Sequence, residues 1–187
     1  MRVENGNVLT QGSGDEGQLG HGHENESIEF LEVDLLASQN IIAIDAGGSH
    51  SAAISRWFCW ISLIIMLLIS CVGSGKLFCW GGNLWGQIGI DFTCESIPIP
   101  KQVEFSGNGN LKVASVACGA AHNLALLENG TVWSWGMGAN GRLGHGNEFS
   151  LSSPKRISAF APHEITTISC GWSHSICVHN NSSIYTF

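Results

Sequence analysis

Basic residues are scarce in this sequence of 187 residues. Only 8 lysines and arginines stand against 15 acidic residues, which gives a formal net charge of −7. Proteins that bind nucleic acid neutralise phosphates with clustered Lys and Arg side chains, so this composition argues against direct nucleic-acid binding. Residues 1–6 lack the apolar core of a signal peptide, which favours a cytoplasmic or nuclear location.

Paired cysteine motifs are also missing. The chain has 7 cysteines but no CxxC pair, the spacing typical of zinc and redox sites. Cys118 and Cys170 instead occupy equivalent places, each just before a glycine in a recurring motif. We therefore expect buried, reduced thiols, and we predict neither a metal nor any other cofactor.

Helical periodicity is absent outside residues 57–74. Short segments rich in β-branched, aromatic and small apolar residues alternate with turn signals, which is typical of an all-β protein. Strands are expected at Val113–Cys118, His122–Leu127 and Val132–Trp135, with further segments at Lys101–Val103 and Lys155–Ile157. Asn129 and Gly130 separate two of these strands, and this dipeptide predicts a type I′ hairpin turn.

Two glycine signatures recur in register along the chain. One is a Gly-x-Leu/Ile-Gly turn that begins at Gly17, Gly86 and Gly141, and the other is a Gly-x-x-His motif that ends at His50, His122 and His174. His122 and His174 lie 52 residues apart. Four short strands in a unit of about 50 residues predict one blade of a β-propeller.

The signature residues are expected to be structural. They are Gly17, Gly20, Gly47, His50, Gly81, Gly86, Gly89, Gly119, His122, Gly136, Gly141, Gly144, Gly171 and His174. Residues 12–17 and 136–141 match the GxGxxG pattern of dinucleotide sites, but a polar loop follows each one instead of a helix, so the demands of a recurring turn explain them better. Each histidine is expected to bridge strand backbones inside its own blade. We predict no catalytic residue.

The tryptophans divide into two groups. Trp80, Trp133 and Trp135 lie in the strand before the glycine turn and are expected to pack inside the blade. Trp85 and Trp172 lie in loops, which makes them the candidate surface contacts.

These units resemble a known repeat family. The segments "GTVWSWGMGANGRLGHG", "GKLFCWGGNLWGQIG" and "GNVLTQGSGDEGQLGHG", which alternate with "SVACGAAHNLAL" and "SCGWSHSICV", are similar to the regulator of chromosome condensation repeat. The resemblance implies a seven-bladed propeller fold. With three full signatures and the start of a fourth, the chain is expected to form a partial propeller of about three to four blades, as a fragment or splice variant that stops within a unit.

The resemblance implies several functions. Members include a guanine-nucleotide exchange factor for the small GTPase Ran that also docks on nucleosomes, a plant ultraviolet-B receptor, and proteins with ubiquitin-ligase or signalling domains. We expect a non-enzymatic scaffold whose loops 92–100 and 147–154 contact a protein partner. The alternatives are an exchange factor for a Ran-type GTPase and an ultraviolet-B receptor. The receptor's Gly-Trp-Arg-His-Thr motif has one partial match, at residues 171–175, and Gly48 and Ala120 occupy the positions equivalent to Trp172.

Residues 57–74 interrupt the repeat. His50 and Leu77 are 27 residues apart, whereas the equivalent His122 and Val132 are 10 apart. This uncharged apolar segment has three interpretations: translated non-coding or alternatively spliced sequence, an apolar helix packed on the propeller or a partner, or a membrane anchor over residues 57–73. The flanking strands are expected to pair as one hairpin, which disfavours a single membrane span. The whole chain, residues 1–187, is interpreted as one partial propeller domain, and residues 57–74 are an insertion within one of its hairpins.

Overall fold

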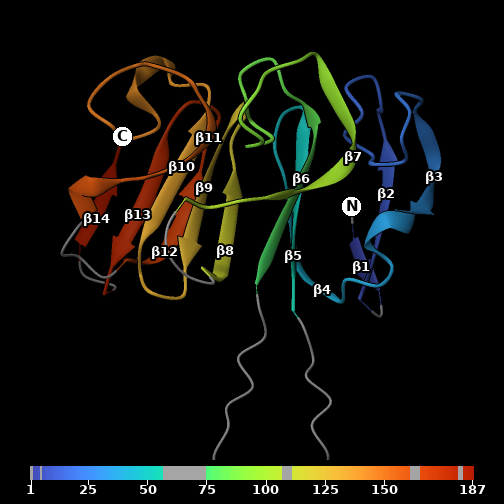
Figure 1. Cartoon of the computed structure of the whole chain (residues 1–187), viewed down its shortest axis with the longest axis horizontal. Helices are drawn as coiled ribbons and strands as arrows, with labels where there is room; N and C mark the ends of the chain where they lie inside the picture. Colours follow the sequence, from blue (N-terminus) through green and yellow to red (C-terminus); the bar gives the residue numbers. More distant parts are fainter. Residues whose placement is uncertain (1, 5, 57–74, 107–110, 161–164, 181–182) are drawn as a thin grey trace, which may run out of the picture.

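The structure is a computed structural model that describes residues 2–4, 6–56, 75–106, 111–160, 165–180 and 183–187. In these residues the regular elements are β-strands and three short 3-10 turns, η1 (Asp34–Leu36), η2 (Ala139–Gly141) and η3 (Ser158–Phe160). The strands form four antiparallel sheets that stand side by side as the blades of a partial propeller (Figure 1). The predicted all-β, partial-propeller fold is therefore confirmed.

The four sheets follow the order of the chain. The first contains β1 (Arg2–Glu4), β2 (Asn7–Gly12) and β3 (Ser27–Glu32), and the second contains β4 (Ile41–Ala46), β5 (His50–Ser55), β6 (Lys76–Gly82) and β7 (Ser96–Val103). The third contains β8 (Val113–Cys118), β9 (His122–Leu127), β10 (Val132–Gly136) and β11 (Leu151–Arg156), and the fourth contains β12 (Ile165–Cys170), β13 (Ser175–His179) and β14 (Ser183–Thr186). In each sheet, consecutive strands are neighbours.

Three apolar clusters hold adjacent sheets together. Strand β8 packs against β4 and β5, and β12 packs against β8 and β9, so the first strand of each of these sheets faces the preceding blade. Both faces of the second and third sheets are covered, and every residue of β5 and β9 is buried. Strands covered on both faces need continuous apolar or small side chains, which explains why these segments read as unbroken runs.

The outer strands begin earlier than predicted. We expected Lys101–Val103 and Lys155–Ile157, but β7 begins at Ser96 and β11 at Leu151. The predicted contact loops 92–100 and 147–154 are therefore loops only in their first halves. The strands continue through Pro98, Pro100 and Pro154, because proline is tolerated in an edge strand where no partner needs its missing N–H.

The predicted type I′ turn at Asn129 and Gly130 is wrong. Gly130 has a positive φ of 76°, but Asn129 does not adopt a positive φ. The Gly130 N–H donates to the Leu127 carbonyl at 2.9 Å, as in a type I turn followed by one left-handed residue. The Asn129 side chain accepts the Thr131 N–H at 3.1 Å, which favours this alternative turn.

The hairpin that flanks residues 57–74 forms as predicted. Strands β5 and β6 pair from His50 opposite Gly81 to Ser55 opposite Lys76, so the ends of the intervening segment leave from adjacent strands (Figure 1). Within the described residues, no helix has the length and apolar character needed to cross a membrane. Residues 57–74 lie outside the described part of the chain. The three interpretations of this segment, as spliced or non-coding sequence, as a packed helix or as a membrane anchor, therefore stay predictions.

Candidate functional site: the turn face

One face of the partial propeller carries both glycine signatures. It is made by the connections that follow β2, β4, β6, β8, β10 and β12, all at the top of Figure 1. We call this surface the turn face and define it as residues 13–26, 47–49, 83–95, 119–121, 137–150 and 171–174, all of which the structure describes.

Each Gly-x-x-His motif packs its histidine ring onto its glycine. A Cβ atom added to Gly47, Gly119 or Gly171 would overlap the imidazole of the histidine three residues later. His50 and His122 are almost fully buried, whereas His174 is exposed. The glycine is thus required by the space that the ring occupies, because any side chain there would displace it.

His50 and His122 connect neighbouring blades, which corrects, for these two histidines, the prediction that each bridges strands within its own blade. His50 Nε2 donates to Asn123 Oδ1 at 2.7 Å, and His122 Nε2 lies 3.1 Å from Ser175 Oγ. Asn123 and Ser175 then donate to the carbonyls of Gln87 and Arg142, at 2.7 and 2.8 Å. Each pair of bonds therefore links the histidine of one blade, through a side chain of the next blade, to the glycine turn of the histidine's own blade.

The Gly-x-Leu/Ile-Gly turns receive an aromatic side chain from the following blade. Trp80 Nε1 donates to the Gln18 carbonyl at 2.9 Å, and Trp135 Nε1 donates to the Gln87 carbonyl at 3.0 Å. A Cβ at Gly20 or Gly89 would lie 2.8 Å from the respective indole nitrogen.

Replacement of Gly119 by alanine is expected to destabilise the protein by about 2 kcal/mol, because the added methyl group overlaps the buried His122 ring. Urea unfolding of the purified chain measures this change. The His122→Ser background is the control, since a short side chain removes the overlap, and the cost of Gly119→Ala should there fall by at least half. Equal costs in both backgrounds would contradict the packing explanation.

Burial suppresses the reactivity of the titratable groups near the turns. Burial, and then the nearby Arg142 guanidinium and His50, lower the pKa of His122 to about 4. Burial also lowers the pKa of His50 and raises the pKa of Cys118, and it raises the pKa values of Cys170 and Cys177 to about 12. These histidines are therefore neutral, and these thiols are protonated, at neutral pH.

Two hydroxyl–histidine pairs resemble a nucleophile and its base. Ser134 Oγ lies 2.9 Å from His145 Nε2, and Thr10 Oγ1 lies 2.9 Å from His21 Nε2. Both hydroxyls are buried, and they donate to the Leu143 and Leu19 carbonyls at 2.7 Å. A hydroxyl that a substrate cannot reach holds the loop to its strand and does not attack a substrate.

The described cysteines and acidic residues show no sign of a metal site. In the part of the chain that the structure describes, no three His, Cys, Asp or Glu side chains gather into a group that could hold a metal ion. Cys79, Cys118 and Cys177 are buried, Cys94 and Cys170 are partly buried, and all five are unbridged. Cys59 and Cys71 lie outside the described residues.

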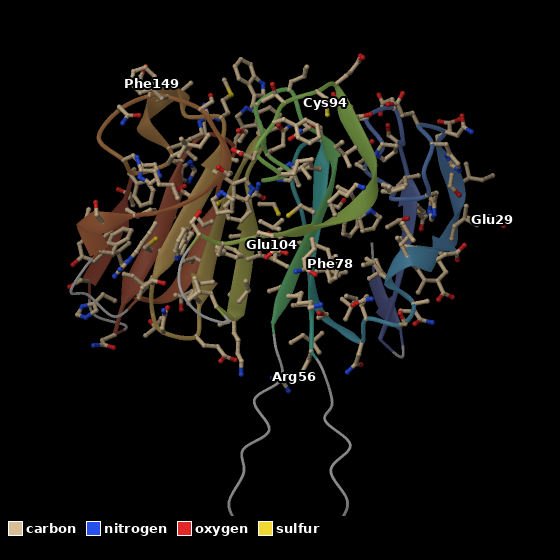
Figure 2. The ribbon with its side chains drawn as sticks, in the orientation of Figure 1. Glu29, Arg56, Phe78, Cys94, Glu104 and Phe149 are labelled. Carbon is tan, nitrogen blue, oxygen red and sulfur yellow. The ribbon has the colours of Figure 1, made fainter. Side chains whose placement is uncertain are left out.

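Large apolar side chains are exposed on the turn face. Trp85 and Trp172, the two predicted surface contacts, are 45% and 77% exposed, whereas Trp80 and Trp135 are fully buried and Trp133 is 7% exposed. Three more exposed side chains are Leu84, Phe92 and Phe149, which are 60%, 53% and 76% exposed. Sequence reasoning placed Phe92 and Phe149 in the predicted contact loops without naming them, and it missed Leu84. Phe149 projects from the upper rim in Figure 2. Single apolar residues in the polar, glycine-rich connection between two strands were the available signal.

The exposed charges of the turn face are all negative. Its carboxylates are Asp15, Glu16, Glu24, Glu26, Asp91, Glu95 and Glu148. Arg142 is the one Lys or Arg in these six fully described connections, and it is 4% exposed. Its Nε donates to the Ala139 carbonyl at 2.7 Å, so the side chain is turned into the protein. The surface combines aromatic contacts with an acidic potential.

Comparisons with known proteins agree with this architecture. The profile of the Regulator of chromosome condensation (RCC1) repeat matches residues 5–54, 74–126 and 129–178, and a second RCC1 repeat profile matches residues 113–142. The ultraviolet-B receptor UVR8 of Arabidopsis thaliana is 30% identical over 96% of this chain, and the human E3 ubiquitin-protein ligase HERC2 is 28% identical over 97%. The chain spans 36% of the receptor and 3% of the ligase.

Two solved structures share the fold. Yeast RCC1 (Prp20) bound to Kap60 superposes with a TM-score of 0.75 at 21% identity, over 97% of this chain and 39% of that one. Prp20p of Saccharomyces cerevisiae gives a TM-score of 0.74 at 24% identity, over 91% of this chain and 39% of the other. With repeat matches over most of its length and blades of this form, the chain belongs to the RCC1 repeat family.

Proposed function

We propose that this protein is a non-enzymatic protein-interaction scaffold that binds its partner through the turn face. The observation that carries the proposal is the exposure of Leu84, Trp85, Phe92, Phe149 and Trp172 on one surface. At protein interfaces a few buried anchors carry most of the binding energy, and aromatic side chains are enriched among them. Their placement on turns held by buried inter-blade bonds supports a rigid binding surface.

The partner that suits this face is a protein with a basic and apolar surface. The turn face also carries seven carboxylates, and its one Arg is buried. Complementary charge accelerates association and is screened by salt. Binding is therefore expected to weaken as the salt concentration rises, while the apolar contacts keep part of the affinity.

Affinity capture with the full chain tests the proposal. The double variant Trp172→Ser with Phe149→Ser removes two side chains that are 77% and 76% exposed, so its fold should be unaffected. Partners kept by the wild type should bind it at least about tenfold more weakly. Leu35→Ser is the matched control, because Leu35 is 57% exposed in η1 between β3 and β4, on the opposite face. Equal loss in both variants would contradict the proposal.

The second candidate is an exchange factor for a Ran-type GTPase. It is supported by the structural likeness to Prp20p, a protein studied for its binding to Gsp1p and histones. Release of a fluorescent guanine nucleotide from a panel of small GTPases separates the two candidates. Faster nucleotide release at a micromolar concentration of this protein would favour exchange activity. If release is not accelerated but the protein still captures a partner, the scaffold function is favoured.

A light-receptor function is the third candidate, and the sequence similarity to the ultraviolet-B receptor UVR8 supports it. Trp172 is the one tryptophan among its repeat-equivalent positions, since Gly48 and Ala120 occupy the other two. A change between monomer and dimer on a sizing column under ultraviolet-B light tests this candidate.

A further inference from the structure

One short segment of β11 combines two features that occur once each in the chain. Ser153 and Pro154 form the single Ser/Thr-Pro dipeptide of the 187 residues, and Lys155 and Arg156, which follow it, are the single pair of adjacent basic residues. A serine followed by proline and then by basic residues is the substrate pattern of proline-directed Ser/Thr kinases, which also use charge to select their substrates. Ser153 is therefore a candidate phosphate acceptor.

The repeat architecture does not require this serine. Counted from the pairs that each outer strand makes with its neighbour, the residues equivalent to Ser153 are Glu29 in β3 and Ile99 in β7. Pro154 does have an equivalent, Pro100 in β7, so the proline belongs to the geometry of the outer strand. The hydroxyl group is particular to the third blade, which leaves it without a structural explanation in the repeat.

The backbone around Ser153 is held less firmly than the rest of β11. This strand is an edge strand of its sheet, and its pairing with β10 shifts between residues 151 and 155, so residues 152–154 lie opposite one residue of β10. The extra residues of such a bulge are left out of the ladder of hydrogen bonds. Ser153 is half-buried, and the two basic side chains that follow Pro154 are exposed.

A carboxylate of the preceding blade faces the Ser153 hydroxyl. Ser153 Oγ donates to Asp91 Oδ1 at 3.4 Å, and the Asp91 N–H donates to the Ser152 carbonyl at 2.9 Å. These two bonds attach the connection 83–95 to β11. Asp91 has a positive φ of 68° and occupies the position of Gly22 in the first blade. The contact between the second and third blades therefore places a negative charge where the equivalent contact has no side chain.

We propose that Ser153 is a phosphorylation site that controls the contact between the second and third blades. A kinase supplies ATP as the phosphoryl donor. The Ser153 oxygen forms a bond to the γ-phosphorus, the bond from this phosphorus to the bridging oxygen breaks, and ADP leaves, while the hydroxyl proton passes to the catalytic base of the kinase. The product carries a charge of about −1.5 to −2 at neutral pH.

The phosphate does not fit where the hydroxyl was. It would lie beside the Asp91 carboxylate, and two neighbouring anions repel each other. Because Pro154 is buried, the kinase binds the segment when residues 151–154 separate locally from the sheet. Repulsion then keeps the modified segment from closing, which releases the connection 83–95 while the blades stay folded. This proposal does not depend on whether the turn face binds a partner.

Phosphate incorporation into the full 187-residue protein tests the assignment. With purified proline-directed kinases and ATP, tandem mass spectrometry should find the phosphate on Ser153. Ser153→Ala should lower incorporation at least about tenfold. Ser152→Ala is the matched control and should retain it, because no proline follows Ser152. An unmodified protein would overturn the proposal, both when a synthetic peptide of residues 149–158 is modified, since the folded site is then closed, and when it is not.

A destabilised variant separates local opening from global unfolding. Val8 is fully buried in the first sheet, so Val8→Ala raises the unfolded fraction without touching β11. If the kinase reaches Ser153 by local opening, the rate of phosphorylation should be unchanged in this variant. A rate that rises in proportion to the unfolded fraction would show that the unfolded chain is the substrate, which contradicts the proposal.

Hydrogen exchange measures the release of the blade contact. The Asp91 amide should exchange at least about tenfold faster after phosphorylation. The Gly22 amide is the internal control, because it makes the equivalent bond to the Pro98 carbonyl at 2.8 Å and should be unaffected. In Asp91→Asn the phosphate meets no negative charge, so the acceleration at residue 91 should be smaller. Equal exchange of the Asp91 amide before and after modification would refute the proposed control of this contact.

Discussion

Replacement of Trp135 by alanine is expected to lower the stability of the protein by about 3–5 kcal/mol. The indole is fully buried between the second and third sheets, and its Nε1 donates to the Gln87 carbonyl at 3.0 Å. The substitution leaves a cavity and a buried carbonyl without that donor. Because a domain of this size has about 5–15 kcal/mol in total, a large part of the stability would be lost. Thermal melting by circular dichroism should show a decrease of about 10 °C or more.

Trp172→Ala is the matched control for this experiment. The same residue type is removed, but Trp172 is 77% exposed on the turn face, and a surface change of this kind costs about 0.5 kcal/mol or less. The two variants should therefore differ clearly in melting temperature, because Trp135 is needed for folding, whereas Trp172 is expected to act in binding. Similar melting temperatures for the two variants would show that the inter-blade contact of Trp135 contributes little.

The protein is expected to lose up to about 3 kcal/mol of stability as the pH falls from about 6.5 to 4. Burial, followed by Arg142 and His50, lowers the pKa of His122 in the folded state to about 4. The unfolded chain takes up a proton near pH 6.5, while the folded protein does not, so protons favour the unfolded state throughout this interval. The lowered pKa of His50 acts in the same direction. Above pH 7 neither residue contributes to the pH dependence.

Urea unfolding at a series of pH values between 7.5 and 4.5 measures this effect. His122→Asn should be less stable at pH 7.5 but should show a shallower decline with acid. Arg142→Gln supplies a second comparison, because glutamine occupies the equivalent positions Gln18 and Gln87, and loss of the positive charge should raise the pKa of His122. A wild-type free energy of unfolding that stays constant over this pH range would contradict the role given to the lowered pKa of His122.

Local structure was largely predictable from the sequence. The strands Val113–Cys118 and His122–Leu127 have the expected bounds, because each is an apolar segment closed by a glycine motif. The hairpin around residues 57–74 was predicted in the same way, from its match to a repeat without an insertion. The starts of β7 and β11 were missed, because prolines within these segments resemble loop residues when the edge position of the strand is unknown.

The candidate site was predictable only in part. Trp85 and Trp172 were recognised as loop residues, but the exposure of Leu84, Phe92 and Phe149 depends on which neighbouring loops cover them. The same limit applies to the histidines. His50 bonds to Asn123, which is 73 residues away in the chain, and no local pattern indicates that partner.

The sequence by itself determined the repeat, the all-β class and the family, because glycine spacing and short apolar segments reflect backbone geometry within a few residues. The tertiary structure decided how the units work together. Inter-blade bonds, the burial of Trp135 and the acidic turn face all depend on contacts between residues far apart in the chain. Such contacts exist only after the blades have packed, and they decide which equivalent residues become core and which remain available to a partner.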